Sequence, residues 1–119
     1  MNRSIFGPVC FNSAAPDDGN MIVLNKIGTD AQKERWLQPV IDGKVRSSFA
    51  MTEPAPGSGS DPSAMLTTAE KKGDSWIVNG RKWFITGAGE AQHFILIART
   101  SDDTRKGPVS YTHLRAHET

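Results

Sequence analysis

The first 46 residues carry apolar positions at helical spacing. Met21, Leu24 and Ile27 follow one another at intervals of three, and the acidic stretch 17–20 lies just before them. Acidic groups favour the start of a helix because the N-terminal end of the helix dipole is positive. Gly28 stands where a C-terminal glycine would end a helix. The pattern therefore predicts a helix over residues 17–27.

A second helix is predicted directly after Gly28. Thr29 and Gln32 match a capping box, in which the threonine hydroxyl accepts from the third helical amide and the glutamine reaches back. Pro39 has no amide donor, so it should kink or divide this helix, and Asp42-Gly43 should end it. The predicted apolar stripe comprises Trp36, Leu37, Val40 and Ile41.

From Ser47 onward the pattern is that of short strands. A strand is predicted over residues 47–52, and the proline- and glycine-rich stretch 54–62 is predicted to be irregular. Asn79-Gly80 lies between the apolar runs 76–78 and 82–86, which is typical of a β-hairpin. Residues 93–98 are apolar on both faces, so we expect a buried central strand there.

These patterns together predict an α+β protein, in which N-terminal helices are followed by an antiparallel, β-barrel-like domain or a small sandwich. The period changes near residue 46, so we divide the chain into a helical part, residues 1–46, and a strand-rich part, residues 47–107. A length of 119 residues is that of one ordinary domain at most.

The composition excludes several classes of function. The net charge is +1, with 14 basic and 13 acidic side chains, so the chain lacks the field that holds nucleic acids or anionic membranes. No apolar run approaches a membrane span, and residues 1–8 do not resemble a secretory signal. The single cysteine, Cys10, excludes an internal disulfide and indicates a reducing, cytoplasmic compartment, or an organelle matrix in a eukaryote.

Few residues suggest chemistry by themselves. The loop 57–61 is rich in glycine and serine, which suits backbone amides that approach an anion, although an ordinary surface turn has the same composition. Thr52 and Thr86 each end a predicted strand, and Phe84 should share a strand face with Thr86, so an aromatic ring and hydroxyls could support a planar heterocycle. Core packing would explain the same residues.

The other polar side chains carry weaker signals. His113 and His117 lie four residues apart, but no third ligand is evident, so no metal site is expected. Glu53 and Glu90 have no partner in the sequence that would adapt them to acid–base work. Cys10 has no basic neighbour that would activate its thiol.

Three stretches in order resemble the acyl-CoA dehydrogenase family. Residues 49–54, Phe-Ala-Met-Thr-Glu-Pro, followed by Gly59-Ser60-Asp61, resemble the first family signature. Residues 73–87 resemble its hairpin and second flavin-contact strand, and residues 28–37 are similar to helices that close its N-terminal domain. The resemblance covers residues 8–107, and the tail 108–119 does not match and is expected to be foreign or disordered.

The resemblance implies a function and a fold. Members are oxidoreductases of fatty acid metabolism that oxidise the α,β carbon–carbon bond of an acyl-CoA, with a carboxylate taking the α proton and FAD taking the hydride. Electron-transferring flavoprotein is the usual acceptor, and members are homo-oligomers. Their fold has a helical N-terminal domain, a middle β-barrel domain and a C-terminal helical domain. This sequence resembles the end of the first and most of the second.

Family contacts can be transferred only to matching positions. The resemblance implies that Phe49, Ala50, Met51 and Thr52 line the flavin, and that Phe84, Ile85 and Thr86 complete this wall. It implies that Gly59 and Ser60 lie beside the pyrophosphate of FAD, and that Ser60 also contacts the acyl-CoA. No catalytic base is assigned, since the family's glutamate lies in the C-terminal domain, which we expect to be missing.

The resemblance also has departures and competitors. The spacing from Glu53 to Asp61 is longer than in common members, and Ala55-Pro56 is the simplest place for the insertion. Without the base domain, the chain itself is expected to be inactive and marginally folded. The alternatives are a fragment of an acyl-CoA oxidase, a non-catalytic β-barrel binding module, and a truncated product without function.

Overall fold

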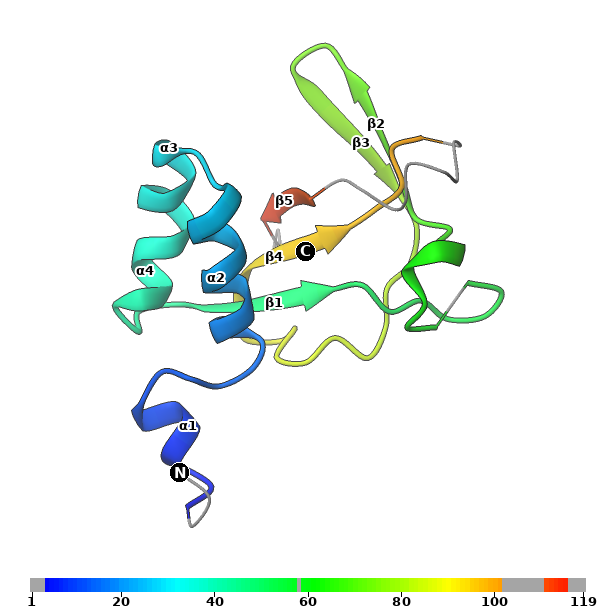
Figure 1. The fold of residues 1–119 in the computed structure, drawn as a ribbon. Helices are drawn as coiled ribbons and strands as arrows, with labels where there is room; N and C mark the ends of the chain where they lie inside the picture. The colour runs from blue at the N-terminus through cyan, green and yellow to red at the C-terminus, as the bar shows by residue number, and fades with distance from the viewer. Residues whose placement is uncertain (1–3, 58, 102–110, 116–119) are drawn as a thin grey trace. The chain divides into compact units, whose positions relative to one another are not determined.

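A computed structural model describes residues 4–57, 59–101 and 111–115. Its helices are α1 (Gly7–Cys10), α2 (Asp17–Ile27), α3 (Asp30–Gln32) and α4 (Gln38–Ile41), with a π-helical stretch at Lys33–Leu37 and a 3-10 turn at Pro62–Ala64. The strands are β1 (Arg46–Ala50), β2 (Thr68–Lys72), β3 (Ser75–Asn79), β4 (Ala91–Ile97) and β5 (Tyr111–Arg115). The described chain therefore mixes helices and strands, as the sequence predicts (Figure 1).

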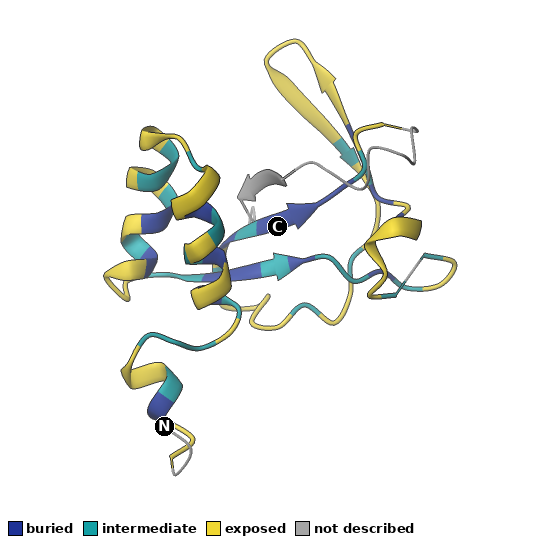
Figure 2. Ribbon diagram, in the orientation of Figure 1, coloured by how far each residue is buried: buried dark blue, intermediate teal, exposed yellow. Residues whose placement is uncertain are grey.

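The strands form two small sheets. One has three strands in the order β1-β4-β5, and the other is the antiparallel β2-β3 hairpin. β4 is the central strand of the first sheet, and residues 95–98 are buried, so the predicted central strand is confirmed (Figure 2). β5 falls within residues 108–119, the tail to which the family resemblance does not extend.

The described residues separate into two compact units. The first comprises residues 4–48, 86–94 and 115, and the second comprises 49–57, 59–85, 95–101 and 111–114. β1 and β4 each contribute residues to both units. These units are interleaved along the sequence, so they do not test the predicted domain boundary at residue 46, which stays a prediction.

In the first unit, α2 packs against the helical run 30–41, and Leu24, Leu37 and Val40 are buried apolar residues of these helices. The predicted capping box is confirmed, because the Gln32 amide donates to Thr29 Oγ1 and the Thr29 amide donates to Gln32 Oε1. The helical run divides before Pro39, at the π-helical stretch, and ends at Gly43 with φ +69°. Ile27 and Ile41, which the periodicity placed on apolar faces, are half or more exposed.

Asp17 has a different role from the one its position suggests. It begins α2, but its side chain does not cap the helix. Instead the carboxylate is 2% exposed and accepts from the Ser47 amide, the Ser47 hydroxyl (both 2.7 Å) and Arg46 Nε (2.5 Å). Asn20 also donates to the Ser47 hydroxyl at 2.9 Å. The polar start of α2 therefore fixes the helix to the beginning of β1.

The predicted hairpin at Asn79-Gly80 is wrong. β3 pairs instead with β2 through a two-residue turn at Gly73-Asp74, with Lys72 opposite Ser75. A Cβ at position 80 would lie only 2.6 Å from the Cβ of Thr67, so this glycine allows close packing on Thr67. Residues 81–85 are not a strand, and Phe84 within them has φ +52°, outside the extended region. β3 therefore pairs with the nearer segment that precedes it.

Candidate functional site

The end of β1 and the segment 82–85 meet in the second unit. The Trp83 amide donates to the Thr52 carbonyl at 3.1 Å, and Lys82 Nζ donates to the Met51 carbonyl at 2.8 Å. These two segments carry six of the residues that the sequence assigned to a flavin wall. Residues 82–83 thus lie beside residues 51–52, although 82–86 is not a strand, and the flavin wall stays a prediction.

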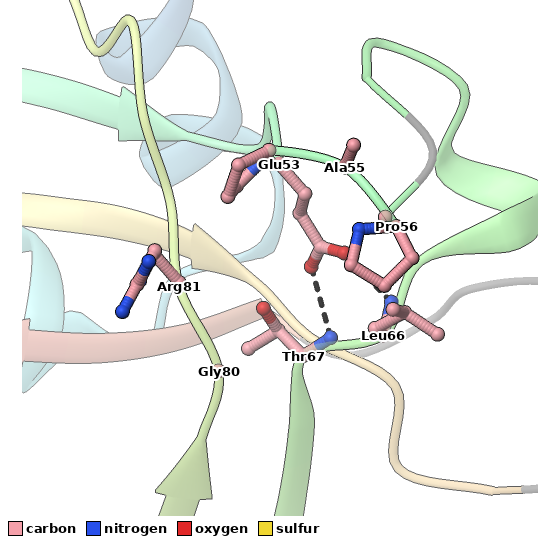
Figure 3. Close-up of a pocket in the computed structure, with 9 residues that line it drawn as sticks. Glu53, Ala55, Pro56, Leu66, Thr67, Gly80 and Arg81 are labelled. Carbon is pink, nitrogen blue, oxygen red and sulfur yellow. Dashed lines mark hydrogen bonds between the residues drawn. The ribbon is translucent and has the colours of Figure 1, made fainter.

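A buried ion pair lies at this junction. Lys82 Nζ is 2.9 Å from Glu53 Oε1, and the two side chains are 9% and 3% exposed. The same carboxylate accepts from the Leu66 amide at 2.7 Å and from the Thr67 amide at 2.9 Å (Figure 3). Sequence reasoning missed this pair, because the two residues are 29 positions apart and nothing in their spacing indicates contact.

The environment of Glu53 favours its charged form. Burial raises the pKa of this carboxyl, but the Thr67 side chain, the Leu66 and Thr67 amides and Lys82 outweigh burial and lower the pKa to about 2. Among the described residues, Thr67 Oγ1 is buried and has no hydrogen-bond partner of ordinary geometry, so the amides and Lys82 are the contacts that the structure shows on this carboxylate. Glu53 is therefore a carboxylate at neutral pH and a poor proton acceptor.

The loop after Glu53 is held against it. The Glu53 amide donates to the Gly59 carbonyl at 3.0 Å, and Gly59 has φ +62°. A Cβ at Gly57 would lie 2.7 Å from both Cβ and Oε2 of Glu53, so only a glycine fits there without displacement. Ser60 is exposed, and the loop ends at Asp61, whose side chain accepts from the Ser63 amide and hydroxyl.

A small cavity of about 190 Å³ opens beside the ion pair. The loop 54–57 lines one side, and Leu66, Thr67, Gly80 and Arg81 line the other (Figure 3). The Glu53 carboxylate lies at its edge and is already satisfied by the Leu66 and Thr67 amides. The cavity is too small for a flavin ring system and better suits a few solvent molecules or a short polar group.

Two aromatic side chains lie exposed next to this junction. Trp83 and Phe84 are 43% and 81% exposed, with ring centroids 4.4 Å apart and planes inclined by 34°. Because Trp83 is bonded to Thr52 through its amide, the pair is fixed beside the end of β1. Such a surface offers a flat apolar face next to polar strand-end groups.

The remaining predicted residues are distributed as follows. Phe49, Met51, Thr52, Gly59 and Ile85 are partly buried, and Ala50 is buried. Thr86 belongs to the first unit, is exposed, and accepts at its carbonyl from the Ser48 hydroxyl at 2.7 Å. The expectation that Phe84 and Thr86 share a strand face is wrong, because no strand forms there.

His113 lies in β5, so it is not on a helix, and His117 falls outside the described residues. Across residues 4–57, 59–101 and 111–115, no group of three His, Cys, Asp or Glu side chains could hold a metal ion. None of the helices in that part of the chain is long and apolar enough to cross a membrane.

Comparisons with known proteins identify the family. The family model of the acyl-CoA dehydrogenase middle domain matches residues 48–117, which includes most of the segment 108–119. Acyl-CoA dehydrogenase family member 11 from Gallus gallus is 47% identical over 87 residues, which is 73% of this chain and 11% of that protein.

Solved structures agree in fold. A Mycobacterium abscessus structure assigned to the acyl-CoA dehydrogenases gives a TM-score of 0.81 at 45% identity and covers 87% of this chain and 26% of its own. Glutaryl-CoA dehydrogenase from Mycobacterium smegmatis, solved with FADH2, gives 0.62 at 35% identity over 70% of this chain and 21% of its own. The chain belongs to the acyl-CoA dehydrogenase family and spans about a quarter or less of the length of these relatives.

Proposed function

We propose that this chain forms part of the flavin-binding surface of an enzyme that oxidises the α,β carbon–carbon bond of an acyl-CoA thioester. The observation that carries the proposal is the pair of hydrogen bonds that join residues 51–52 to residues 82–83. They bring together two segments that are distant in sequence and that the family resemblance assigns to one cofactor. Family membership supports the same cofactor, since relatives include structures with FAD and FADH2.

The residues present fit a flavin. Phe84 offers an exposed aromatic face, and Thr52 lies partly buried at the polar end of β1. We assign Phe49, Ala50, Met51, Thr52, Phe84 and Ile85 to the ring; Thr86, which belongs to the first unit, is a separate prediction of the resemblance. We assign Gly59 and Ser60 to the pyrophosphate, and Ser60 also to the acyl-CoA, because its exposed hydroxyl follows a glycine that a diphosphate could approach closely.

In this proposal the residues of the chain bind the flavin and orient its ring. When bound, FAD supplies the acceptor for the hydride that leaves the β carbon. The aromatic face excludes water from one side of the ring, and hydroxyl donors favour the charge that develops there. Electron-transferring flavoprotein is the proposed acceptor, and the working enzyme is proposed to be a homo-oligomer in the cytoplasm or in an organelle matrix.

Proton removal is not assigned to Glu53. Glu53, the buried carboxylate of the site, is held by Lys82 and has a pKa of about 2, which makes it a weak base. Absence of a positioned base costs roughly 10²–10⁴-fold in rate. We therefore propose that the isolated chain binds flavin weakly and does not catalyse the reaction.

Titration of the purified chain with FAD, followed by quenching of flavin fluorescence, tests the binding. Saturable binding that weakens on Phe84→Ala, but not on Trp76→Ala, is the expected result. Trp76 is a matched control, since it is a 41% exposed aromatic on the separate β2-β3 hairpin. Equal binding by both variants, or none by the parent chain, would contradict the proposed surface.

Mixing the flavin-loaded chain anaerobically with acyl-CoA thioesters tests the catalytic part. We expect no bleaching of the flavin at catalytic rates. Rapid and complete bleaching would show that a base lies within the chain. For a longer protein that contains this sequence, peroxide release in air would identify an acyl-CoA oxidase rather than a dehydrogenase.

A further inference from the structure

Lys82 is buried, charged and has no role in the chemistry described so far. Its side chain is 9% exposed, and a lysine is seldom buried unless its charge is paired. Its ammonium donates to the Met51 carbonyl at 2.8 Å and to Glu53 Oε1 at 2.9 Å. Both acceptors lie in the segment that continues β1, while Lys82 itself directly precedes Trp83 and Phe84.

Glu53 extends this connection to two more segments. Its carboxylate accepts from the Leu66 and Thr67 amides, and its own amide donates to the Gly59 carbonyl. One buried ion pair therefore gathers the end of β1, the glycine-containing loop, the approach to β2 and the segment 82–83. All of these residues belong to the second unit.

We propose that Lys82, held by Glu53, is a positioning residue that sets the separation between Thr52 and Phe84 and thereby shapes the flavin surface. This inference rests on the proposed function. Lys82 donates to the Met51 carbonyl and directly precedes Trp83, so in this proposal it acts through these two residues and not by contact with the cofactor. The Trp83 amide, which donates to the Thr52 carbonyl, reports directly on this arrangement.

The charge of Lys82 supports a role in positioning its neighbours rather than in filling space alone. A methylene chain would occupy the same volume, but it cannot donate hydrogen bonds to a backbone carbonyl and a carboxylate, and the charge of the ammonium strengthens both bonds. Removal of one partner leaves a buried, uncompensated charge, whereas removal of both can be tolerated. The arrangement of residues 51–52 and 82–83 should therefore depend on the Lys82–Glu53 pair. The fold itself should tolerate replacement of both residues together.

Amide hydrogen exchange provides a test that needs no cofactor. In Lys82→Met, we expect exchange at the Trp83 amide to accelerate about tenfold or more, as loss of a charge-assisted bond implies. The Arg99 amide, which donates to the Thr67 carbonyl at 2.8 Å in the same unit, should change much less. Lys72→Met, at an exposed lysine of β2, is the control and should alter neither amide.

If Lys82→Met fails to fold, the double variant Glu53→Gln/Lys82→Met carries the test, because it leaves no unpaired charge. It should fold and still show rapid exchange at Trp83. Lys82→Arg keeps the charge and should restore part of the protection. Protection at Trp83 that is unchanged in the folded double variant would overturn the inference.

FAD titration of the same variants separates this inference from the proposed function. We expect the parent chain and Lys72→Met to bind alike, and the folded double variant to bind at least about tenfold more weakly. Equal binding by parent and double variant would overturn the inference while the proposed function stands. If the parent chain does not bind FAD, the proposed function fails, and the flavin role of Lys82 fails with it.

Discussion

Glu53 joins more segments of the candidate site than any other side chain described above. Its position before Pro54 gives no indication of this, and sequence reasoning found no partner for it. The contact with Lys82 depends on the path of the chain between residues 53 and 82, which no local pattern specifies. The family resemblance named the neighbouring Thr52 and Phe84 but not the pair that lies behind them.

The stability of the chain should depend on the ionisation of Glu53. Its pKa is lowered from 4.5 to about 2, so the stabilisation is fully present above pH 4.5 and is lost as the pH falls towards 2. This difference corresponds to about 3 kcal/mol of unfolding free energy. Urea unfolding of wild type and Glu53→Gln at pH 7, 4.5, 3 and 2 measures it.

The two proteins should differ most at pH 7, and the difference should shrink as the pH approaches 2. Other carboxylates contribute to both proteins alike, so the comparison isolates Glu53. A stability difference that stays constant from pH 7 to pH 2 would contradict the assignment of the lowered pKa to this residue.

Gly80 should not tolerate a side chain. A Cβ there would lie 2.6 Å from Thr67 Cβ and 2.7 Å from Thr67 Cγ2, well inside van der Waals contact. Gly80→Ala should therefore reduce the unfolding free energy by about 1–3 kcal/mol, the usual cost of overpacking. Gly89→Ala is the matched control, because nothing lies within 4 Å of a Cβ at that glycine. Equal stability of the two variants in urea would refute the close contact.

At the scale of elements, local signals predicted the helices well. The capping box of Thr29 and Gln32 and the glycine stop at Gly43 each involve residues four or fewer positions apart, so the sequence alone contains them. Gly28 also ends α2 as predicted, but with φ −70°; a Cβ at this position would lie 2.5 Å from the Leu24 carbonyl oxygen, which explains the glycine.

The strand pairing was predicted less well. Asn79-Gly80 has the composition of a hairpin turn, yet Gly73-Asp74 makes the turn and places β3 against β2. Which of the two turns forms depends on which segment pairs with β3, and this pairing is set by contacts in the folded chain rather than by the local sequence. The run 93–98 was predicted correctly because its apolar character on both faces requires burial wherever its partners lie.

Thr29 should contribute to helix stability through its cap. Thr29→Ala removes the hydroxyl that accepts from the Gln32 amide and should cost about 1 kcal/mol. Thr29→Ser keeps the hydroxyl and should cost much less. Thermal unfolding followed by far-UV circular dichroism measures both, and equal losses in the two variants would argue against the cap.

At the scale of the whole molecule, the described chain exposes many large apolar side chains. They include Phe6, Phe11, Ile27, Trp76, Trp83 and Phe84, each at least 41% exposed. Monomeric proteins seldom expose so much apolar surface, because its contact with water is unfavourable. The relatives, of which the chain spans about a quarter or less, contain further sequence that could cover such surface.

The isolated chain should therefore self-associate and bind hydrophobic dyes. Sedimentation velocity between about 5 and 200 µM should show weight-average mass rising with concentration, and dye fluorescence should rise in parallel. A monodisperse monomer without dye binding over this range would mean that the exposed side chains are covered within the chain itself.

The central claim is that residues 51–52 and 82–85 together present one surface to FAD. Backbone amide shifts of the labelled chain, recorded by NMR during titration with FAD, test it most directly. We predict that the perturbed amides gather at residues 49–52, 59–60 and 84–85, while the hairpin residues 68–79 stay unchanged. Perturbation concentrated on the hairpin, or absent throughout at saturating FAD, would contradict the account.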